Sequence, residues 1–140
     1  MSRLFLVLPA LVAACSASPD SQHAQLLDEV ERQVRLPDQA EPLKAYSRYY
    51  ASAANGEIVG IYLLPDLQRG KCVGDGEDQT SSIGECQPVR GTRNLKANER
   101  LWVDNHTLLP TLSGRGCTVV NVAYNPATGQ PTRVSCSFVK

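Results

Sequence analysis

Asp104 and His106 are the two residues of this 140-residue chain whose types and spacing best suit acid–base chemistry. They lie in a segment, 101–109, that we predict to be a strand, and alternate side chains of a strand share one face. An aspartate beside a histidine can orient the imidazole as a general base. No Ser or Cys stands in a recognisable nucleophile motif, so we interpret them as an ordinary surface pair and expect no enzyme.

The five cysteines form the second group with chemical potential. Four of them make an even set once Cys15 is assigned elsewhere: Cys72, Cys86, Cys117 and Cys136. Zinc is disfavoured, because there is no Cys-x-x-Cys pair and no histidine at ligand spacing. Disulfides are therefore expected. Four cysteines allow three connectivities, and proximity along the chain favours 72 with 86 and 117 with 136.

A basic segment is the candidate for binding anions. Four cationic residues follow one another at steps of three, three and four: Arg90, Arg93, Lys96 and Arg100. They would share one face if the segment were helical. Such a face could bind lipid phosphates, peptidoglycan carboxylates or a partner's acidic patch. Gly91 and Asn94 weaken the helix prediction, and a solvated charged surface is the alternative.

The stretch 65–98 is rich in glycine and proline and is predicted to be mostly loop. Its acidic residues invite a calcium interpretation: Asp75, Glu77, Asp78 and Glu85. The EF-hand spacing is absent, because Thr80 stands at the glycine position and Cys86 at the final ligand position. We therefore expect a solvated acidic loop and neither a metal nor a cofactor.

Two apolar, aromatic segments flank Asn55-Gly56, a hairpin motif, and predict strands at about 44–52 and 57–64. They carry four of the tyrosines: Tyr46, Tyr49, Tyr50 and Tyr62. Exposed tyrosines could stack on glycans. Cross-strand pairs with a buried ring and a wet hydroxyl are the interpretation we favour.

Residues 1–14, MSRLFLVLPALVAA, combine one positive charge at Arg3 with an apolar run. This predicts a signal peptide, because the run is about half of the roughly 20 residues a membrane-spanning helix needs, and Pro9 interrupts it. The leader ends in VAAC at residues 12–15, which resembles the lipobox of bacterial lipoproteins: an aliphatic residue, two small residues and a cysteine. An ordinary secretory leader is the alternative, and it would leave an odd cysteine in an exported chain.

The resemblance implies that Cys15 carries diacylglycerol, that the leader is cut before it, and that the new amino group is acylated, for example with palmitate. Two or more acyl chains give a stable membrane anchor. Ser16 favours the outer membrane, because aspartate at that position favours inner-membrane retention in Gram-negative members of the class. The stretch from Val34 through the tyrosine hairpin also resembles small uncharacterised exported proteins of Gram-negative bacteria, which implies no activity.

Ser18-Pro19-Asp20 predicts the start of a helix, with serine as cap and proline in the first turn. Apolar residues then recur at helical spacing up to Leu36-Pro37: Ala24, Leu26, Leu27, Val30 and Val34. The short tether should hold the domain close to the bilayer. We expect a signal peptide at 1–14, a lipidated tether at 15–19 and one periplasmic domain at 20–140.

The clearest hairpin predicted joins residues 117–124 to 131–139, with Asn125 facing Gln130. In this register Cys117 and Cys136 are diagonal neighbours on one face, near enough that a modest bulge could bring them into bonding range. The segments together predict an α+β fold: one N-terminal amphipathic helix packed on a mostly antiparallel sheet of four to six strands.

The charge balance, 14 basic against 14 acidic residues, becomes 13 against 14 without Arg3 and gives no indication of a nucleic-acid partner. The leading function hypothesis is an envelope lipoprotein that acts as a structural or protein-interaction module facing the periplasm. The alternative is a small-ligand or glycan-binding module using the tyrosine hairpin or the basic segment. An enzyme of unrecognised type comes third.

Overall fold

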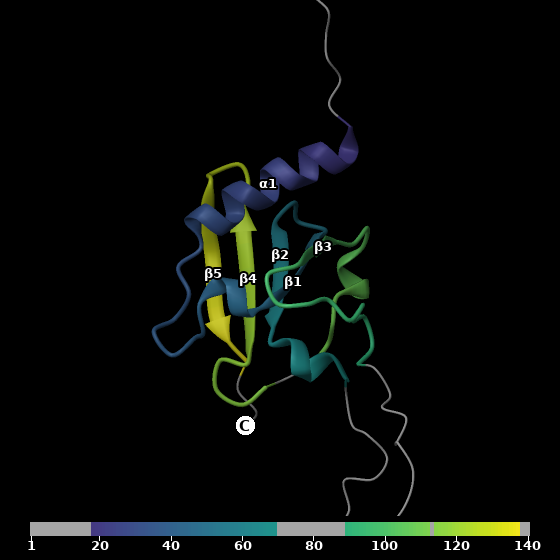
Figure 1. The fold of residues 1–140 in the computed structure, drawn as a ribbon. Coiled ribbons are helices and arrows are strands. Elements are labelled where there is room, and N and C mark those ends of the chain that lie inside the picture. Colours follow the sequence, from purple (N-terminus) through teal and green to yellow (C-terminus); the bar gives the residue numbers. More distant parts are fainter. Residues whose placement is uncertain (1–17, 70–88, 113, 138–140) are drawn as a thin grey trace, which may run out of the picture.

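The computed structural model describes residues 18–69, 89–112 and 114–137. In these ranges one helix, α1 (Pro19–Gln33), crosses a five-stranded sheet (Figure 1). The strands are β1 (Ser47–Ser52), β2 (Ile58–Leu63), β3 (Arg100–Trp102), β4 (Val119–Asn125) and β5 (Gln130–Cys136). Three 3₁₀ turns connect them: η1 (Leu43–Ala45), η2 (Pro65–Arg69) and η3 (His106–Leu108). The predicted α+β class, with one helix and a mostly antiparallel sheet, is confirmed.

The strand order is β3-β1-β2-β4-β5. Three of the four pairings are antiparallel, and β3 lies parallel to β1, with Tyr50 opposite Trp102. Parallel neighbours need a long crossover connection. Here the chain between β1 and β3 supplies it, and the end of this crossover carries the basic segment.

Helix α1 begins where the sequence predicts, with Ser18 as the N-cap residue and Pro19 in the first turn. The Ser18 backbone carbonyl accepts hydrogen bonds from the N–H groups of Ser21 and Gln22, but its side chain makes no capping bond. The helix ends at Gln33, a few residues before Pro37, because Val34 already has an extended backbone. Its inward positions are Leu27 and Val30, both buried.

Two predicted strand boundaries are wrong. The first strand begins at Ser47, because residues 43–45 form the η1 turn after Pro42. The strand predicted at 101–109 is confined to Arg100–Trp102. Beyond it, the Asn105 side chain accepts a hydrogen bond from the Thr107 N–H and starts the η3 turn, so the extended conformation cannot continue.

Both predicted hairpins are present. The first is closed by a bond from the Ala53 N–H to the Glu57 carbonyl, and Gly56 adopts φ of 82° in its turn. Asn125 pairs with Gln130 at the second hairpin, as predicted. A register shift between Ala123 and Tyr124 marks a bulge in this ladder.

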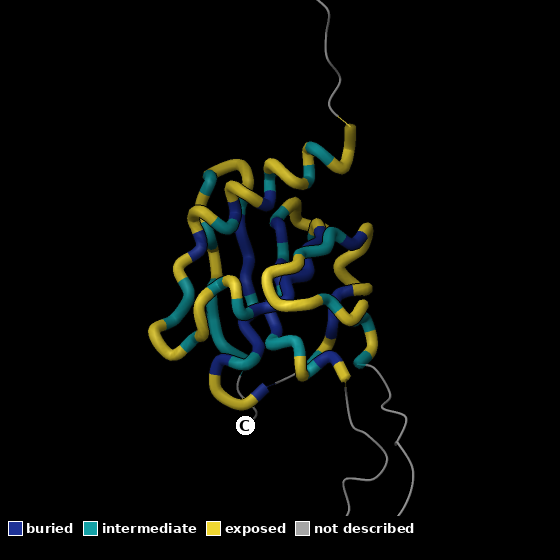
Figure 2. The backbone as a smooth tube through the Cα atoms, in the orientation of Figure 1, coloured by how far each residue is buried: buried dark blue, intermediate teal, exposed yellow. Residues whose placement is uncertain are grey.

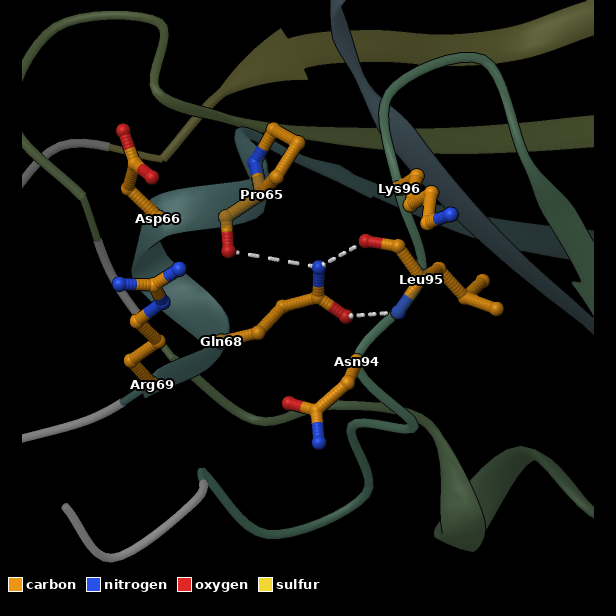
Figure 3. Close-up of a pocket in the computed structure, with 7 residues that line it drawn as sticks. All are labelled: Pro65, Asp66, Gln68, Arg69, Asn94, Leu95 and Lys96. Atoms are coloured by element: carbon orange, nitrogen blue, oxygen red, sulfur yellow. Dashed lines mark hydrogen bonds between the residues drawn. The ribbon is translucent and has the colours of Figure 1, made fainter. Parts of the chain in front are cut away.

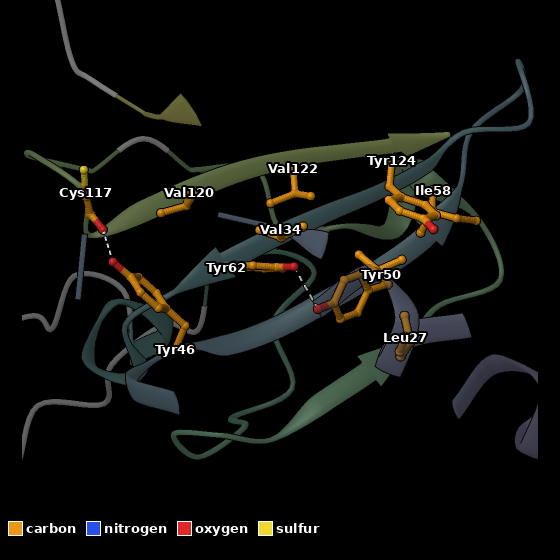
Figure 4. Close-up of a cluster of buried hydrophobic side chains, with 11 residues drawn as sticks. Leu27, Val34, Tyr46, Tyr50, Ile58, Tyr62, Cys117, Val120, Val122 and Tyr124 are labelled. Carbon is orange, nitrogen blue, oxygen red and sulfur yellow. Dashed lines mark hydrogen bonds between the residues drawn. The ribbon is translucent and has the colours of Figure 1, made fainter. Parts of the chain in front are cut away.

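The inner strands β1, β2 and β4 are largely buried on both faces, whereas the edge strand β5 is partly exposed (Figure 2). Helix α1 covers one face through a cluster that includes Leu27, Val30, Tyr50, Tyr62 and Val122 (Figure 4). The opposite face is covered by connecting segments, and its cluster comprises Tyr49, Ala51, Leu63, Val103, Leu109 and Val119. The loops on this second face therefore have a hydrophobic attachment to the sheet.

Candidate functional site

Asp104 and His106 do not share the strand face that the sequence predicts for them. Both are exposed, and His106 belongs to the η3 turn instead of a strand. No hydrogen bond or ion pair joins the two among the residues that the structure describes. The alternation that would have put them on one strand face ends at Trp102.

The tyrosines form no glycan-stacking surface. Tyr46, Tyr49, Tyr50 and Tyr62 each have 0% exposure, as does Tyr124. Burial raises the pKa of all five. The rings of Tyr50 and Tyr62 meet edge to face with centroids 5.6 Å apart, and their hydroxyls are hydrogen-bonded at 2.9 Å (Figure 4). The hydroxyls therefore bond inside the protein and are not left wet.

A buried polar network joins helix α1 to the sheet. The Tyr50 hydroxyl donates to Oε1 of Glu31 at 2.8 Å, and Arg48 Nε lies 3.2 Å from the same oxygen. Arg48, with 4% exposure, also donates from Nη2 to the backbone carbonyl of Asn98 at 2.9 Å. Its contact with Glu31 is an ion pair without hydrogen-bond geometry at Nε. A buried arginine is tolerable because of these partners.

Arg100 belongs to this network and not to a binding face. Its guanidinium lies 2.6 Å from Oδ1 of Asp28 and 3.5 Å from Oε2 of Glu31. Desolvation alone would lower the Arg100 pKa, but the Asp28 hydrogen bond and the nearby carboxylates raise it. Because these acidic groups neutralise it, Arg100 serves to attach the edge strand β3 to helix α1.

The other three residues of the basic segment, Arg90, Arg93 and Lys96, are on a loop. Residues 89–99 contain no helix, and Asn94 and Asn98 adopt positive φ angles of 54° and 67°. The proposed common face is therefore not formed. Lys96 lines one hollow with Asp66 and Arg69, whereas Arg90 and Arg93 line another.

The groove that contains Arg90 and Arg93 has a volume of about 530 Å³. We call it the arginine groove. Its opposite wall is the segment around η3, which contributes Thr107, Leu108 and Thr111. Leu108 is 52% exposed. No local sequence pattern indicates that residues 90–93 and 107–111 meet.

Gly91 explains the close approach of the two walls. It adopts φ of 85°, and a Cβ there would lie 2.8 Å from the backbone carbonyl oxygen of Leu108. Only glycine takes this backbone conformation and this contact without strain. The two walls therefore touch backbone to backbone, and Arg90 and Arg93, on either side of Gly91, line the groove.

Gln68, a fully buried amide of η2, supports the loop from beneath. Its side chain accepts a hydrogen bond from the Leu95 N–H at 2.9 Å and donates to the Leu95 carbonyl at 2.5 Å (Figure 3). It also accepts from the Tyr49 hydroxyl, which in turn accepts from the Arg93 N–H at 2.9 Å. The hollow of about 450 Å³ beside Gln68 is thus built around an amide whose bonds are already used. Its role is to position the loop.

Cys117 and Cys136 form a disulfide, with Cα atoms 4.7 Å apart. Cys117 precedes strand β4, and its backbone carbonyl accepts a hydrogen bond from the Tyr46 hydroxyl at 2.6 Å (Figure 4). One of the two predicted pairs is therefore present. Cys15, Cys72 and Cys86 lie outside the described residues, as does the acidic loop that we discussed for calcium.

A stacked pair that the sequence did not indicate lies near the start of helix α1. The His23 and Trp102 rings are nearly parallel, with centroids 4.1 Å apart and 13° between their planes. Trp102 shares the edge strand β3 with Arg100, so both residues fasten this strand to the helix. We interpret the stack as part of the packing between helix and sheet.

Searches for similar proteins matched no protein-family model, no curated protein and no solved structure. In the described part of the chain, no group of His, Cys, Asp and Glu side chains is arranged to hold a metal ion. The helix in that part is also too short and too polar to cross a membrane. The arginine groove is the candidate site that the geometry supports best.

Proposed function

We propose that the protein is an envelope lipoprotein, attached through Cys15 to the outer membrane, whose domain is a non-enzymatic interaction module facing the periplasm. The resemblance of residues 12–15 to a lipobox supports a lipid anchor on Cys15. The disulfide between Cys117 and Cys136 supports an oxidising compartment, because such bonds persist outside the reducing cytosol.

The observation that carries this proposal is the start of helix α1 at Pro19. Four residue steps separate Pro19 from Cys15, which span at most roughly 14 Å when fully extended. A domain on such a tether would be held at the membrane surface and could reach only partners that lie near it. This favours a local interaction role over free diffusion in the periplasm.

The arrangement of the domain supports a partner on the side away from the anchor. Helix α1 packs on one face of the sheet, whereas Leu109 of the arginine groove belongs to the cluster on the opposite face. An anchor at the start of the helix would therefore leave the groove accessible.

The anchor is tested by mass spectrometry of the protein isolated from membranes. The proposal expects a mature chain that begins at a lipid-modified Cys15, and a Cys15→Ser variant that loses the modification and is not retained by membranes. Ser16→Asp is the matched control: it should keep the lipid and move the protein towards the inner membrane. An unmodified thiol on a freely soluble wild-type chain would contradict the proposal.

The interaction role is tested by crosslinking in living cells. A photoreactive residue at Leu108, the exposed apolar residue of the groove, should capture a specific neighbour. The control places the same photoreactive residue at position 35, where Arg35 is exposed beyond the end of the helix. Recovery of the same abundant envelope proteins from both positions would remove the support for a specific partner.

A further inference from the structure

We infer that the arginine groove binds a free carboxylate of a short peptide through Arg90 and Arg93 and packs a neighbouring apolar side chain of that peptide against Leu108. This deepens the proposed function, on which it rests, by naming the chemistry of the partner. The walls of the groove are residues 90–93 and 107–111.

The charge on the groove is uncompensated within the described chain. Arg48 and Arg100 are paired with carboxylates of helix α1, whereas neither Arg90 nor Arg93 forms an ion pair with any residue that the structure describes. Both side chains are exposed. Two guanidinium groups on one loop favour an anionic ligand, and their planar donor geometry matches a carboxylate.

The position of Arg93 is fixed by buried groups. Its backbone N–H donates to the Tyr49 hydroxyl, which has 0% exposure and is itself bonded to Gln68. Thr92 adds a bond from its hydroxyl to the Val89 carbonyl at 2.7 Å. The backbone that carries the arginines is therefore held in place before a ligand arrives, which reduces the entropy lost on binding.

The opposite wall is apolar in part, and this decides between anions. Among the described residues, Leu108 is the only large hydrophobic residue that is exposed to solvent, and it lines this groove. The buried Leu109 continues that wall, and Thr107 and Thr111 lie beside it in the lining. Inorganic phosphate would leave this surface wet, whereas a peptide with an apolar residue beside its carboxylate would cover it.

The volume of the groove, about 530 Å³, lies in the usual range for sites of small ligands and suits a peptide of a few residues. The hydroxyls of Thr107 and Thr111 have no hydrogen bond to a described residue and can bond the peptide backbone. The groove thus offers charge, apolar contact and hydrogen-bonding groups within one surface.

The test is a titration of the full mature chain, in nonionic detergent, with N-acetyl-leucyl-alanine as the probe. Its C-terminal amide, which removes only the charge, and inorganic phosphate are the comparison ligands. Binding is followed by NMR shifts of the Gly91 and Arg93 amides. We expect the acid to bind at least tenfold more tightly than the amide or phosphate.

Variants locate the site. Arg93→Ala and Arg90→Ala should each weaken binding of the acid about tenfold, Arg93→Lys by less, and Leu108→Ser about threefold. Arg35→Ala, an exposed arginine elsewhere, should bind as the wild type does. Circular dichroism of each variant checks that it is folded.

Equal binding of acid and amide, or unchanged binding by the two arginine-to-alanine variants, would overturn the inference. Phosphate that binds as tightly as the peptide acid would also overturn it, because the apolar wall would then contribute nothing. These outcomes are independent of the anchor. If wild-type protein isolated from cells carries no lipid but binds the acid, the lipoprotein proposal is wrong and the groove assignment is retained.

Discussion

The Tyr50 hydroxyl donates a hydrogen bond to Oε1 of Glu31 across 2.8 Å, which joins an inner strand of the sheet to helix α1. Arg48 approaches the same carboxylate and is nearly inaccessible to water. Glu31 therefore compensates a buried charge and a buried hydroxyl together. Its side chain has 15% exposure, so solvent screens this interaction only in part.

Glu31→Ala should destabilise the protein by about 3 kcal/mol, because removal of one partner leaves an uncompensated buried charge. Urea unfolding followed by circular dichroism measures this difference. Glu29→Ala is the matched control on the same helix: Glu29 also accepts a hydrogen bond from a buried tyrosine, Tyr124, but pairs with no arginine in the described part of the chain. It should lower the free energy of unfolding by only about 1 kcal/mol. Equal losses in the two variants would show that the arginine contact contributes nothing.

Alkaline pH should unfold the protein cooperatively. All five tyrosines have pKa values raised above 10.0, chiefly by burial, and the upward shifts are largest at Tyr50 and Tyr62. Above pH 10 the unfolded chain loses these protons while the folded chain keeps them. The free energy of unfolding is therefore undiminished by the tyrosines below pH 10 and falls above it, by up to about 1.4 kcal/mol per pH unit for each such tyrosine.

Absorbance at 295 nm, which reports tyrosinate, checks this expectation together with near-ultraviolet circular dichroism. The two signals should change in one step above pH 10. A gradual rise in absorbance with a midpoint near pH 10, while the dichroism stays native, would contradict the expectation that the tyrosines are buried and have raised pKa values.

The sequence predicts the local parts of this structure well. The Ser18-Pro19 start of the helix and the loop between Asn125 and Gln130 are specified by residues adjacent in the chain, and the structure agrees at both places. The pairing of Cys117 with Cys136 follows from the same hairpin. In each case a turn or cap limits the conformations that neighbouring residues can adopt.

The long-range parts could not be predicted. Arg48 of strand β1 can be buried because it pairs with Glu31 of helix α1. A loop and the η1 turn separate these two elements in the sequence. The steps of three and four in the basic segment suit a helix, but left-handed backbone at Asn94 and Asn98 prevents one. The arginine groove depends on the contact of Gly91 with the carbonyl of Leu108, and no local pattern indicates that contact.

Loss of the disulfide should destabilise the domain without unfolding it. A bridge that closes a loop of this length contributes about 3 kcal/mol in the chain-entropy model. The double variant Cys117→Ala and Cys136→Ala should lower the free energy of unfolding by that amount. Addition of a reductant should then have a much smaller effect on this variant than on the wild type. Peptide mapping without reduction tests the pair predicted between Cys72 and Cys86; a Cys72–Cys117 crosslinked peptide would contradict both pairs.

Gln68→Ala should loosen the loop that carries the arginines. The substitution leaves the Tyr49 hydroxyl and the Leu95 N–H without their buried partner, and an unsatisfied buried group costs about 1–3 kcal/mol. Hydrogen exchange of the Leu95 and Arg93 amides should accelerate more than exchange in β4. Gln33→Ala, at the exposed end of the helix, is the control and should leave these rates unchanged. If exchange accelerates equally throughout the sheet, Gln68 stabilises the whole domain and has no particular effect on the loop.

Gly91→Ala isolates the backbone contact that shapes the arginine groove. A Cβ there meets the Leu108 carbonyl oxygen at 2.8 Å and also requires a strained positive φ. Gly56→Ala is the matched control, because Gly56 has nearly the same φ, 82°, and open space around it. The control should destabilise the protein by about 1 kcal/mol through backbone strain alone. Gly91→Ala should add the steric clash with the Leu108 carbonyl to this backbone strain, should lower the free energy of unfolding by about 2–3 kcal/mol in total, and should push the two walls apart. The amide shifts of Thr107 and Leu108 should therefore change in Gly91→Ala and not in Gly56→Ala, and unchanged shifts in both would show that the walls do not depend on this contact.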